Sequence, residues 1–183
     1  MIIRKKFRFE GAHIVRNCTS QRCRENIHGH SYEVEVFLKP GRSPNNLMII
    51  DPVLLNNINE FISSFDHAFA LWNMESDEVK DGIYRINTRV AEIPVSPSAE
   101  GYSLLFSFVI SQMILAAKLA DIGGEVKLHA VGVHETQSGY AESLVDDVSL
   151  VQFTVEDIKF NEGIKREWRD KEWWFRLLNV NNL

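Results

Sequence analysis

Two histidines separated by one glycine, His28 and His30, begin a stretch in which apolar residues alternate with polar ones. From position 30 the even-numbered residues are His, Tyr, Val, Val and Leu, whereas the odd-numbered ones are mostly polar. This period of two is typical of a β-strand with one buried face, so both imidazoles should point to the apolar side. Side chains two residues apart on a strand lie roughly 7 Å apart and can bind one metal ion together.

A third histidine, His13, ends an earlier stretch with the same alternation. Its apolar face also carries Phe7, Phe9 and Gly11. Antiparallel pairing of the two stretches across the connection 14–27 would place His13 beside His28 and His30. Three histidines around zinc leave its fourth position open, which is the pattern of a catalytic site. The alternative interpretation is that the three rings are unrelated and are satisfied by backbone hydrogen bonds.

Both cysteines of the chain, Cys18 and Cys23, lie in the connection between these stretches. A disulfide between them is one interpretation, although a reducing compartment disfavours it. They could instead be further zinc ligands. In the third interpretation one of them is a nucleophile or base, because a neighbouring cation lowers the pKa of a thiol.

A second chemical feature is the adjacent pair Asp66 and His67. An imidazole oriented by a carboxylate can exchange protons near neutral pH. The alternative is a histidine that interacts with the dipole of a preceding helix. That helix is predicted because apolar residues recur at helical spacing through 54–65, after Asp51 as N-cap and Pro52 at the first helical position.

The remaining pattern predicts the elements that must hold these groups in place. A second helix should begin near Ser98 or Ala99 and end at Gly123-Gly124. Further strands are predicted over 47–50, 83–86, 89–93, 125–135 and 148–155. Of these, 83–86 and 89–93 should pair as a small hairpin that follows an acidic, exposed loop. Two hairpins of long strands with two helices packed on one face indicate an α+β fold.

The composition excludes several classes of protein. At 183 residues the chain fits one domain, and its 45% hydrophobic and 25% charged residues are ordinary for a globular protein. A net charge of -5 argues against nucleic-acid binding, which needs a basic surface. No apolar run approaches the ~18 residues of a membrane span. The charged N-terminus lacks the features of a signal peptide, so we expect a cytoplasmic protein.

The C-terminal part has a composition of its own. Three of the four tryptophans of the chain are Trp168, Trp173 and Trp174. Residues 160–178 are predicted to be helical, and two adjacent tryptophans should not both face the core of one helix's own domain. We therefore expect a domain at 1–156 and a helical extension at 157–183 that packs on the domain or on a neighbouring subunit.

Six short stretches resemble, in order, the motifs of the 6-pyruvoyltetrahydropterin synthase family, which includes the 6-carboxytetrahydropterin synthases. They are Phe9-Glu10-Gly11-Ala12-His13, His28-Gly29-His30, Ile49-Ile50-Asp51, Asp66-His67, Ser98-Ala99-Glu100 and His134-Glu135-Thr136. The resemblance covers roughly residues 5–145. It implies the tunnelling fold, a four-stranded antiparallel sheet with two helices on one face. Protomers of this fold form trimer-based rings, commonly hexamers, with active sites at subunit boundaries.

The resemblance also implies roles for individual residues. The ligands of a zinc ion would be His13, His28 and His30. Asp66 and His67 would form a proton relay, assisted by the thiol of Cys23 in the loop before the His-Gly-His stretch. Glu135 would anchor the pterin, because a carboxylate accepts two parallel donors bidentately. Glu100 would be a second substrate-binding residue.

The reaction that the resemblance implies is that of a zinc-dependent lyase acting on 7,8-dihydroneopterin triphosphate. Hydroxyl groups of the substrate side chain would take the open zinc position, and a base would remove a proton. Either triphosphate would then leave or a carbon–carbon bond would break. Iron or nickel could also occupy a site made of three histidines, so zinc is partly implied by the family.

The loop before His28 departs from the family pattern. Many members have the cysteine four residues before this histidine, where Arg24 stands here, and Cys23 is one residue farther away. A subgroup that cleaves the side chain to 6-hydroxymethyl-dihydropterin has a glutamate three residues before it, which is the spacing of Glu25. An extended loop would point Cys23 and Glu25 the same way, so we expect Glu25 to matter at least as much. The displaced cysteine leaves a catalytically silent pterin- or metal-binding member as an alternative.

Overall fold

The computed structural model describes residues 1–40, 52–119 and 126–179. Three expectations fall outside these residues: the strand at 47–50, the Asp51 cap, and the helix end at Gly123-Gly124. The predicted helices themselves lie largely within the described residues, as α2 (Pro52–Ser63) and α4 (Ala99–Leu119).

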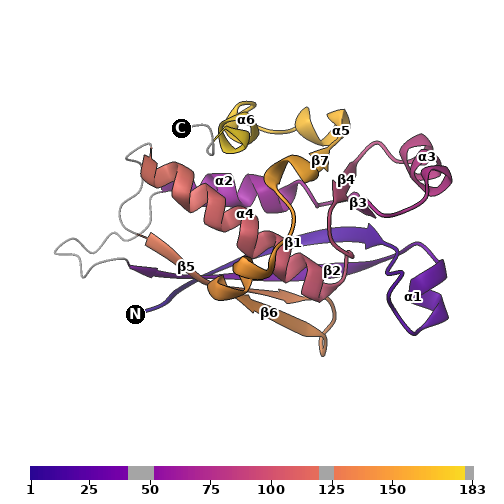
Figure 1. Ribbon diagram of the computed structural model, residues 1–183, viewed down its shortest axis with the longest axis horizontal. Helices are drawn as coiled ribbons and strands as arrows, with labels where there is room; N and C mark the ends of the chain where they lie inside the picture. Colours follow the sequence, from indigo (N-terminus) through magenta and orange to yellow (C-terminus); the bar gives the residue numbers. More distant parts are fainter. Residues whose placement is uncertain (41–51, 120–125, 180–183) are drawn as a thin grey trace.

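Among the described residues, one seven-stranded sheet organises the protein, with the strand order β6-β5-β2-β1-β3-β4-β7 (Figure 1). The strands are β1 (Ile3–His13), β2 (His28–Pro40), β3 (Ala68–Trp72), β4 (Val90–Ile93), β5 (Val126–His134), β6 (Tyr140–Leu144) and β7 (Lys159–Phe160). The four strands from β6 to β1 are antiparallel and form the expected four-stranded unit. The sheet is larger than predicted, because β3 pairs in parallel with both β1 and β4, and β7 joins the far edge.

Helices α2 and α4 lie side by side on one face of this sheet, which confirms the predicted layering (Figure 1). The alternation predicted for β1 and β2 explains the packing, since their apolar positions share the core with both helices. The buried residues of this core include Phe9, Tyr32, Val34, Phe61, Leu105, Phe106 and Val109. Helix α4 is also the single helix among the described residues that is long and apolar enough to cross a membrane. The burial of α4 side chains against the sheet accounts for the apolar composition of this helix.

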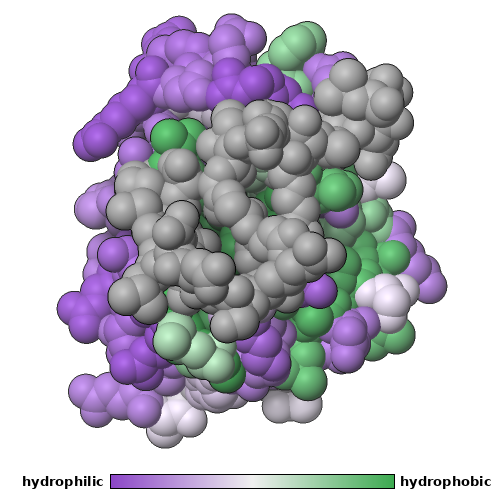
Figure 2. Space-filling model, turned by 90° about the vertical axis from the view of Figure 1, so that its left-hand side faces the viewer, coloured by the Kyte–Doolittle hydropathy of each residue, from purple (hydrophilic) through white to green (hydrophobic). Residues whose placement is uncertain are grey.

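The opposite face of the four-stranded unit is charged. Arg4, Lys6 and Arg8 of β1 pair there with Glu33 and Glu35 of β2. Figure 2 shows the end of the molecule that lies on the left of Figure 1, with hydrophilic residues along one side and hydrophobic residues more frequent on the other. This agrees with a sheet that presents one charged face and covers the other with apolar helices.

The predicted hairpin at 83–93 is wrong. Residues 83–86 belong to a helix, α3 (Asp77–Ile86), which also takes up part of the expected acidic loop, and β4 pairs with β3 instead. Helix α3 covers the second face of β3 and β4, where Phe69, Leu71, Ile83 and Val90 form a separate apolar cluster. Parallel strands buried on both faces carry nearly continuous apolar residues, so they show no alternation.

The predicted strand at 148–155 is also wrong, and β6 takes its place in the sheet. The residues that follow β6 form 3₁₀ helices at Val145–Leu150 and Val155–Asp157. An aspartate caps the N-terminus of each 3₁₀ helix. Asp147 accepts a hydrogen bond from the Leu144 amide and Asp157 accepts one from the Thr154 amide, each at 2.8 Å. Such local side-chain acceptors compete with the pairing of a strand.

The C-terminal part contains two short helices, α5 (Glu162–Lys165) and α6 (Trp173–Leu178), rather than one long helix. Both adjacent tryptophans are buried within this chain, contrary to expectation. Trp173 packs against Phe61 of α2, with ring centroids 6.4 Å apart, whereas Trp174 packs against Phe160 of β7 at 5.0 Å. A helix as short as α6 can be covered on two sides, so both rings reach one core.

Candidate active site

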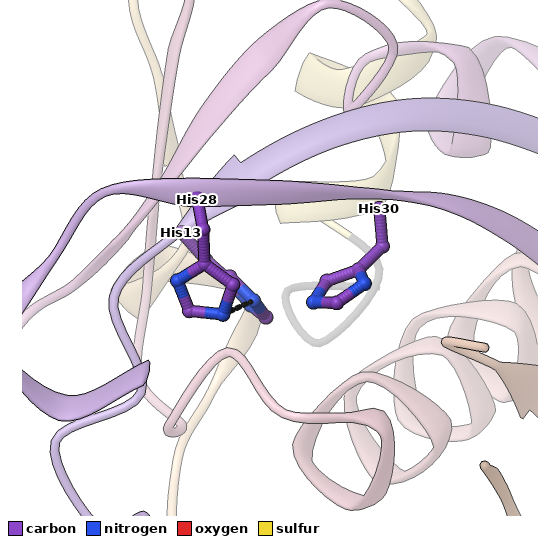
Figure 3. Close-up of side chains that lie close together, drawn as sticks. All are labelled: His13, His28 and His30. Carbon is purple, nitrogen blue, oxygen red and sulfur yellow. Dashed lines mark hydrogen bonds between the residues drawn. The ribbon is translucent and has the colours of Figure 1, made fainter. Parts of the chain in front are cut away.

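The register of β1 and β2 brings the three histidines together. His13 lies directly opposite His28, and Gly11 lies opposite His30, so all three imidazoles project to the face that carries the helices (Figure 3). Gly29, which separates the two histidines of β2, is required sterically. A Cβ atom there would lie 2.7 Å from the carbonyl oxygen of Gly11.

The ring nitrogens of the three histidines converge on one point. One nitrogen from each ring lies within 4.8 Å of those of the other two, and the Nε2 atoms of His13 and His28 are 3.0 Å apart. Tetrahedral zinc with Zn–N bonds of roughly 2.0–2.1 Å would hold its ligand nitrogens about 3.3 Å apart. The spacing therefore fits a shared zinc ion.

Hydrogen bonds at the other ring nitrogens fix which atom faces this point. Nδ1 of His13 donates to the carbonyl of Pro97, and Nδ1 of His28 donates to the carbonyl of Asn26 at 3.0 Å. This arrangement leaves both Nε2 atoms as acceptors, as the second shell of a metal site does. Burial lowers the pKa of His13 to about 4, so the ring is neutral at physiological pH, as metal coordination requires. The residues fit a zinc ion.

Glu135, at the end of β5, lies next to the histidines. Its Oε1 is 3.8 Å from Nε2 of His13 and accepts a hydrogen bond of 3.3 Å from the Tyr32 hydroxyl. The same hydroxyl lies 3.1 Å from Nδ1 of His13, so the buried Tyr32 joins the two groups. Burial raises the pKa of Tyr32, which keeps its hydroxyl a donor. Sequence reasoning missed this role, although the alternation that identified His28 and His30 continues to Tyr32.

Asp66 and His67 form a pair at the corner between α2 and β3, with Nδ1 of His67 3.0 Å from Oδ2 of Asp66. The Glu10 amide donates to Oδ1 of Asp66 at 2.8 Å. His67 lines a hollow of about 390 Å³ together with Glu10, Ser31 and Asn87, and His30 of the metal site is also among its lining residues. Within the described part of the chain, no hydrogen bond or ion pair connects this pair to the three metal-site histidines.

Cys23 and Glu25 lie on a short helix, α1 (Gln21–Glu25), so the premise of an extended loop is wrong. Residues two apart on a helix are separated by roughly 200° and do not face the same way. The Glu25 carboxylate accepts hydrogen bonds from Gln21 at 2.8 Å and from Arg24 at 3.2 Å, and these lower its pKa. Cys23 is a free, half-buried thiol, as is Cys18.

Arg16, just after β1, ties α1 to the rest of the protein. Its Nε donates to Glu75 at 2.7 Å and its Nη1 donates to the carbonyl of Arg24 at 2.9 Å. The Val15 amide also donates to the carbonyl of Cys23 at 3.0 Å. The segment that carries Cys23 is therefore fixed to the residues that directly follow His13 and its strand.

Glu100 stands in the first turn of α4, near Pro97, and is exposed. No contact of its side chain with the histidines is found among the described residues. A second group that could ligate a metal, Glu33, Glu35 and His134, lies on the charged face of the sheet. Lys6 pairs with both of these carboxylates, so cations already neutralise this group.

Comparison with protein-family models matches residues 2–144 to the family described as 6-pyruvoyl tetrahydropterin synthase. The chain belongs to this family. It is an enzyme of the 6-pyruvoyl- and 6-carboxytetrahydropterin synthase type. A curated member, the 6-carboxy-5,6,7,8-tetrahydropterin synthase of Helicobacter pylori strain J99, is 38% identical over 184 residues, which span 98% of this chain and 92% of the relative.

Solved structures of other proteins share the fold. The uncharacterised protein WS1659 of Wolinella succinogenes has a TM-score of 0.60 at 19% identity, covering 79% of this chain and 97% of that one. The 6-pyruvoyl tetrahydropterin synthase of Plasmodium vivax has a TM-score of 0.54 at 20% identity, covering 78% and 97%. The expected tunnelling fold is thereby confirmed.

Proposed function

We propose that this protein is a zinc-dependent lyase that converts 7,8-dihydroneopterin triphosphate to 6-carboxy-5,6,7,8-tetrahydropterin. The observation that carries the proposal is the convergence of three histidine nitrogens beside the Glu135 carboxylate, on a chain of this family. Similarity to the Helicobacter pylori enzyme over nearly the whole chain favours the carboxy product. A zinc ion bound to His13, His28 and His30 would supply Lewis-acid polarisation of the substrate's side-chain oxygens.

Glu135 is proposed to hold the pterin ring. The amino group and the adjacent ring NH of a pterin present two parallel donors, which a carboxylate accepts bidentately. Tyr32 donates to one oxygen of this carboxylate, which holds it beside the metal ligand His13. The substrate side chain would then extend from Glu135 toward the three histidines.

Proton transfer is assigned to Cys23 and to the pair Asp66 and His67. In one protomer the pair is held at the α2–β3 corner, and its contacts do not reach the histidines. Family members are oligomers, and we propose that a ring of protomers brings the pair of one subunit to the histidines of the next. The exposure of His67, at 74% of its side chain, is consistent with a position at such a boundary.

The geometry of α1 favours Cys23 over Glu25 as the base. Hydrogen bonds from Gln21 and Arg24 stabilise the ionised carboxylate of Glu25 and weaken it as a base. The thiol of Cys23 is free, and the backbone carbonyl of the same residue accepts a hydrogen bond from Val15, two residues after the metal ligand His13.

Mass spectrometry of the products tests this assignment and the function together. Zinc-loaded wild-type protein should convert dihydroneopterin triphosphate to the 6-carboxy product. Cys23→Ala should lower kcat by about 10²-fold or more, as the loss of a general base does. Glu25→Gln should retain kcat within about threefold, because removing an exposed carboxylate of α1 leaves the general base in place.

Two outcomes would contradict the proposal in different ways. Substrate loss no faster than in an enzyme-free control would refute the lyase activity. A large loss in Glu25→Gln with little loss in Cys23→Ala, together with 6-hydroxymethyl-dihydropterin among the products, would assign the base to Glu25 and the enzyme to the side-chain-cleaving type.

A further inference from the structure

The corner that carries Asp66 and His67 has a strained backbone. His67 has a φ of 51°, the single positive value for a residue other than glycine in the described chain. Such a conformation persists only where surrounding contacts enforce it. One such contact is the hydrogen bond of 2.6 Å from the His67 amide to the carbonyl of Glu10.

Arg89, just before β4, holds the corner from the other side. Its Nε donates to the carbonyl of Asp66 at 3.0 Å and its Nη2 donates to the carbonyl of Ser63 at 3.3 Å. These carbonyls lie at the C-terminal end of α2, where a cation is favoured by the helix dipole. The remaining nitrogen, Nη1, forms an ion pair of 2.6 Å with Glu167 of the C-terminal part, a charge contact that lacks hydrogen-bond geometry.

The C-terminal part contacts both α2 and the residues beside Arg89. Nε1 of the buried Trp168 donates to Oγ of Ser64 at 2.8 Å, one residue after Ser63. Asn161 donates from its side chain to the carbonyl of Thr88 at 3.0 Å and from its amide to the carbonyl of Val90 at 3.1 Å. The two neighbours of Arg89 in the chain are therefore both fixed by one residue.

Aromatic packing anchors this part of the chain to the core. The ring of Trp168 lies 5.6 Å from that of Phe160 and 5.0 Å from that of Trp173. Gly163 approaches so closely that a Cβ atom there would lie 1.7 Å from the carbonyl oxygen of Thr88. Glu167 and Trp168, which contact Arg89 and Ser64, therefore belong to a well-packed segment that can hold these residues in place.

We propose that residues 161–174 form a brace that positions the Asp66–His67 corner, with Glu167 and Trp168 as its positioning residues. The inference rests on the proposed proton-transfer role of Asp66 and His67. Glu167 holds the Arg89 guanidinium, which donates to the carbonyl of Asp66. Trp168 holds Ser64, which directly follows α2 and leads into the corner. The brace lies outside residues 2–144, which the family model matches, but within the region aligned with the Helicobacter pylori relative.

Hydrogen–deuterium exchange on the full chain tests the brace without any assay of activity. Glu167→Gln keeps the size of the side chain and removes its ion pair. Trp168→Phe keeps an aromatic ring and removes the N–H donor. Both should raise exchange in a peptide spanning residues 64–69 and leave a reference peptide of β2 unchanged. The matched control is Glu162→Gln, which removes another carboxylate of the same part; among the described residues its ion pair is with Lys165.

Kinetics of the zinc-loaded protein supply the functional readout. The two brace variants should lower kcat on the order of tenfold, below the roughly 10²-fold that a 1 Å misplacement can cost. KM and zinc content should stay at wild-type values, because Glu135 and the three histidines lie elsewhere. Glu162→Gln should match the wild type in every measurement.

Unchanged exchange at 64–69 in both brace variants would overturn the inference, and so would faster exchange spread equally to β2. Faster local exchange with unchanged kcat would also overturn it, because the corner would then not need support. If the wild-type protein shows no turnover, the proposed function fails, whereas local exchange still decides whether the brace exists.

Discussion

Replacing His28 or His30 with alanine should remove most of the zinc from the purified protein and abolish turnover. Wild-type protein should contain about one zinc ion per chain, because its three ligand nitrogens already converge within 4.8 Å. Two histidines leave the ion with too few protein ligands to be retained through purification. Elemental analysis by mass spectrometry measures the stoichiometry directly.

His134→Ala is the matched control, because His134 belongs to the second group with Glu33 and Glu35 on the opposite face of the sheet. It should leave the zinc content unchanged, since Lys6 already neutralises those carboxylates. Circular dichroism would verify that each variant is folded. Zinc at wild-type stoichiometry in both His28→Ala and His30→Ala would show that the ligands lie elsewhere.

Replacing Glu135 with glutamine should lower kcat/KM about a hundredfold to a thousandfold while the zinc content stays constant. An amide has one acceptor where the carboxylate has two, so one pterin donor would lose its partner. Truncating one side of a buried, charged hydrogen-bond pair costs roughly 2–5 kcal/mol. Steady-state kinetics and elemental analysis on the same preparation separate this effect from loss of the metal.

Two further variants make this result specific. Tyr32→Phe removes the hydroxyl that donates to Glu135 and should cause a smaller loss of kcat/KM than Glu135→Gln. Glu142→Gln removes a carboxylate of β6 whose partner is the Tyr140 hydroxyl, and it should behave as wild type. Wild-type kcat/KM in Glu135→Gln would place the pterin at another residue.

The part of the site that the sequence predicts is the part in which strand alternation places functional side chains on one face of the sheet. The alternation of β1 and β2 was enough to place His13, His28 and His30 together, and the register confirms it. Tyr32 lies on the same face, but a buried tyrosine is usually structural, so the alternation alone does not predict a role in the site. The position of its hydroxyl depends on Glu135, about a hundred residues later in the chain.

The sequence does not predict the short elements whose conformation depends on tertiary contacts rather than on periodicity. The signals for α3 were present in the sequence: Ser76 caps it, Asp77 and Glu78 fill the first turn, and Arg85 lies in the last. They were interpreted as an acidic loop. The conformation of Cys23 and Glu25 depends on the contacts of Arg16 with Glu75 and Arg24, which no local pattern shows.

The most direct test of the central claim is to locate zinc and a pterin in crystals of the protein. Anomalous diffraction at the zinc edge should give a peak about 2.1 Å from one nitrogen each of His13, His28 and His30. A bound pterin should place its amino group and ring NH on the Glu135 carboxylate. A zinc peak beside Glu33, Glu35 and His134, or a pterin bound away from Glu135, would contradict this account.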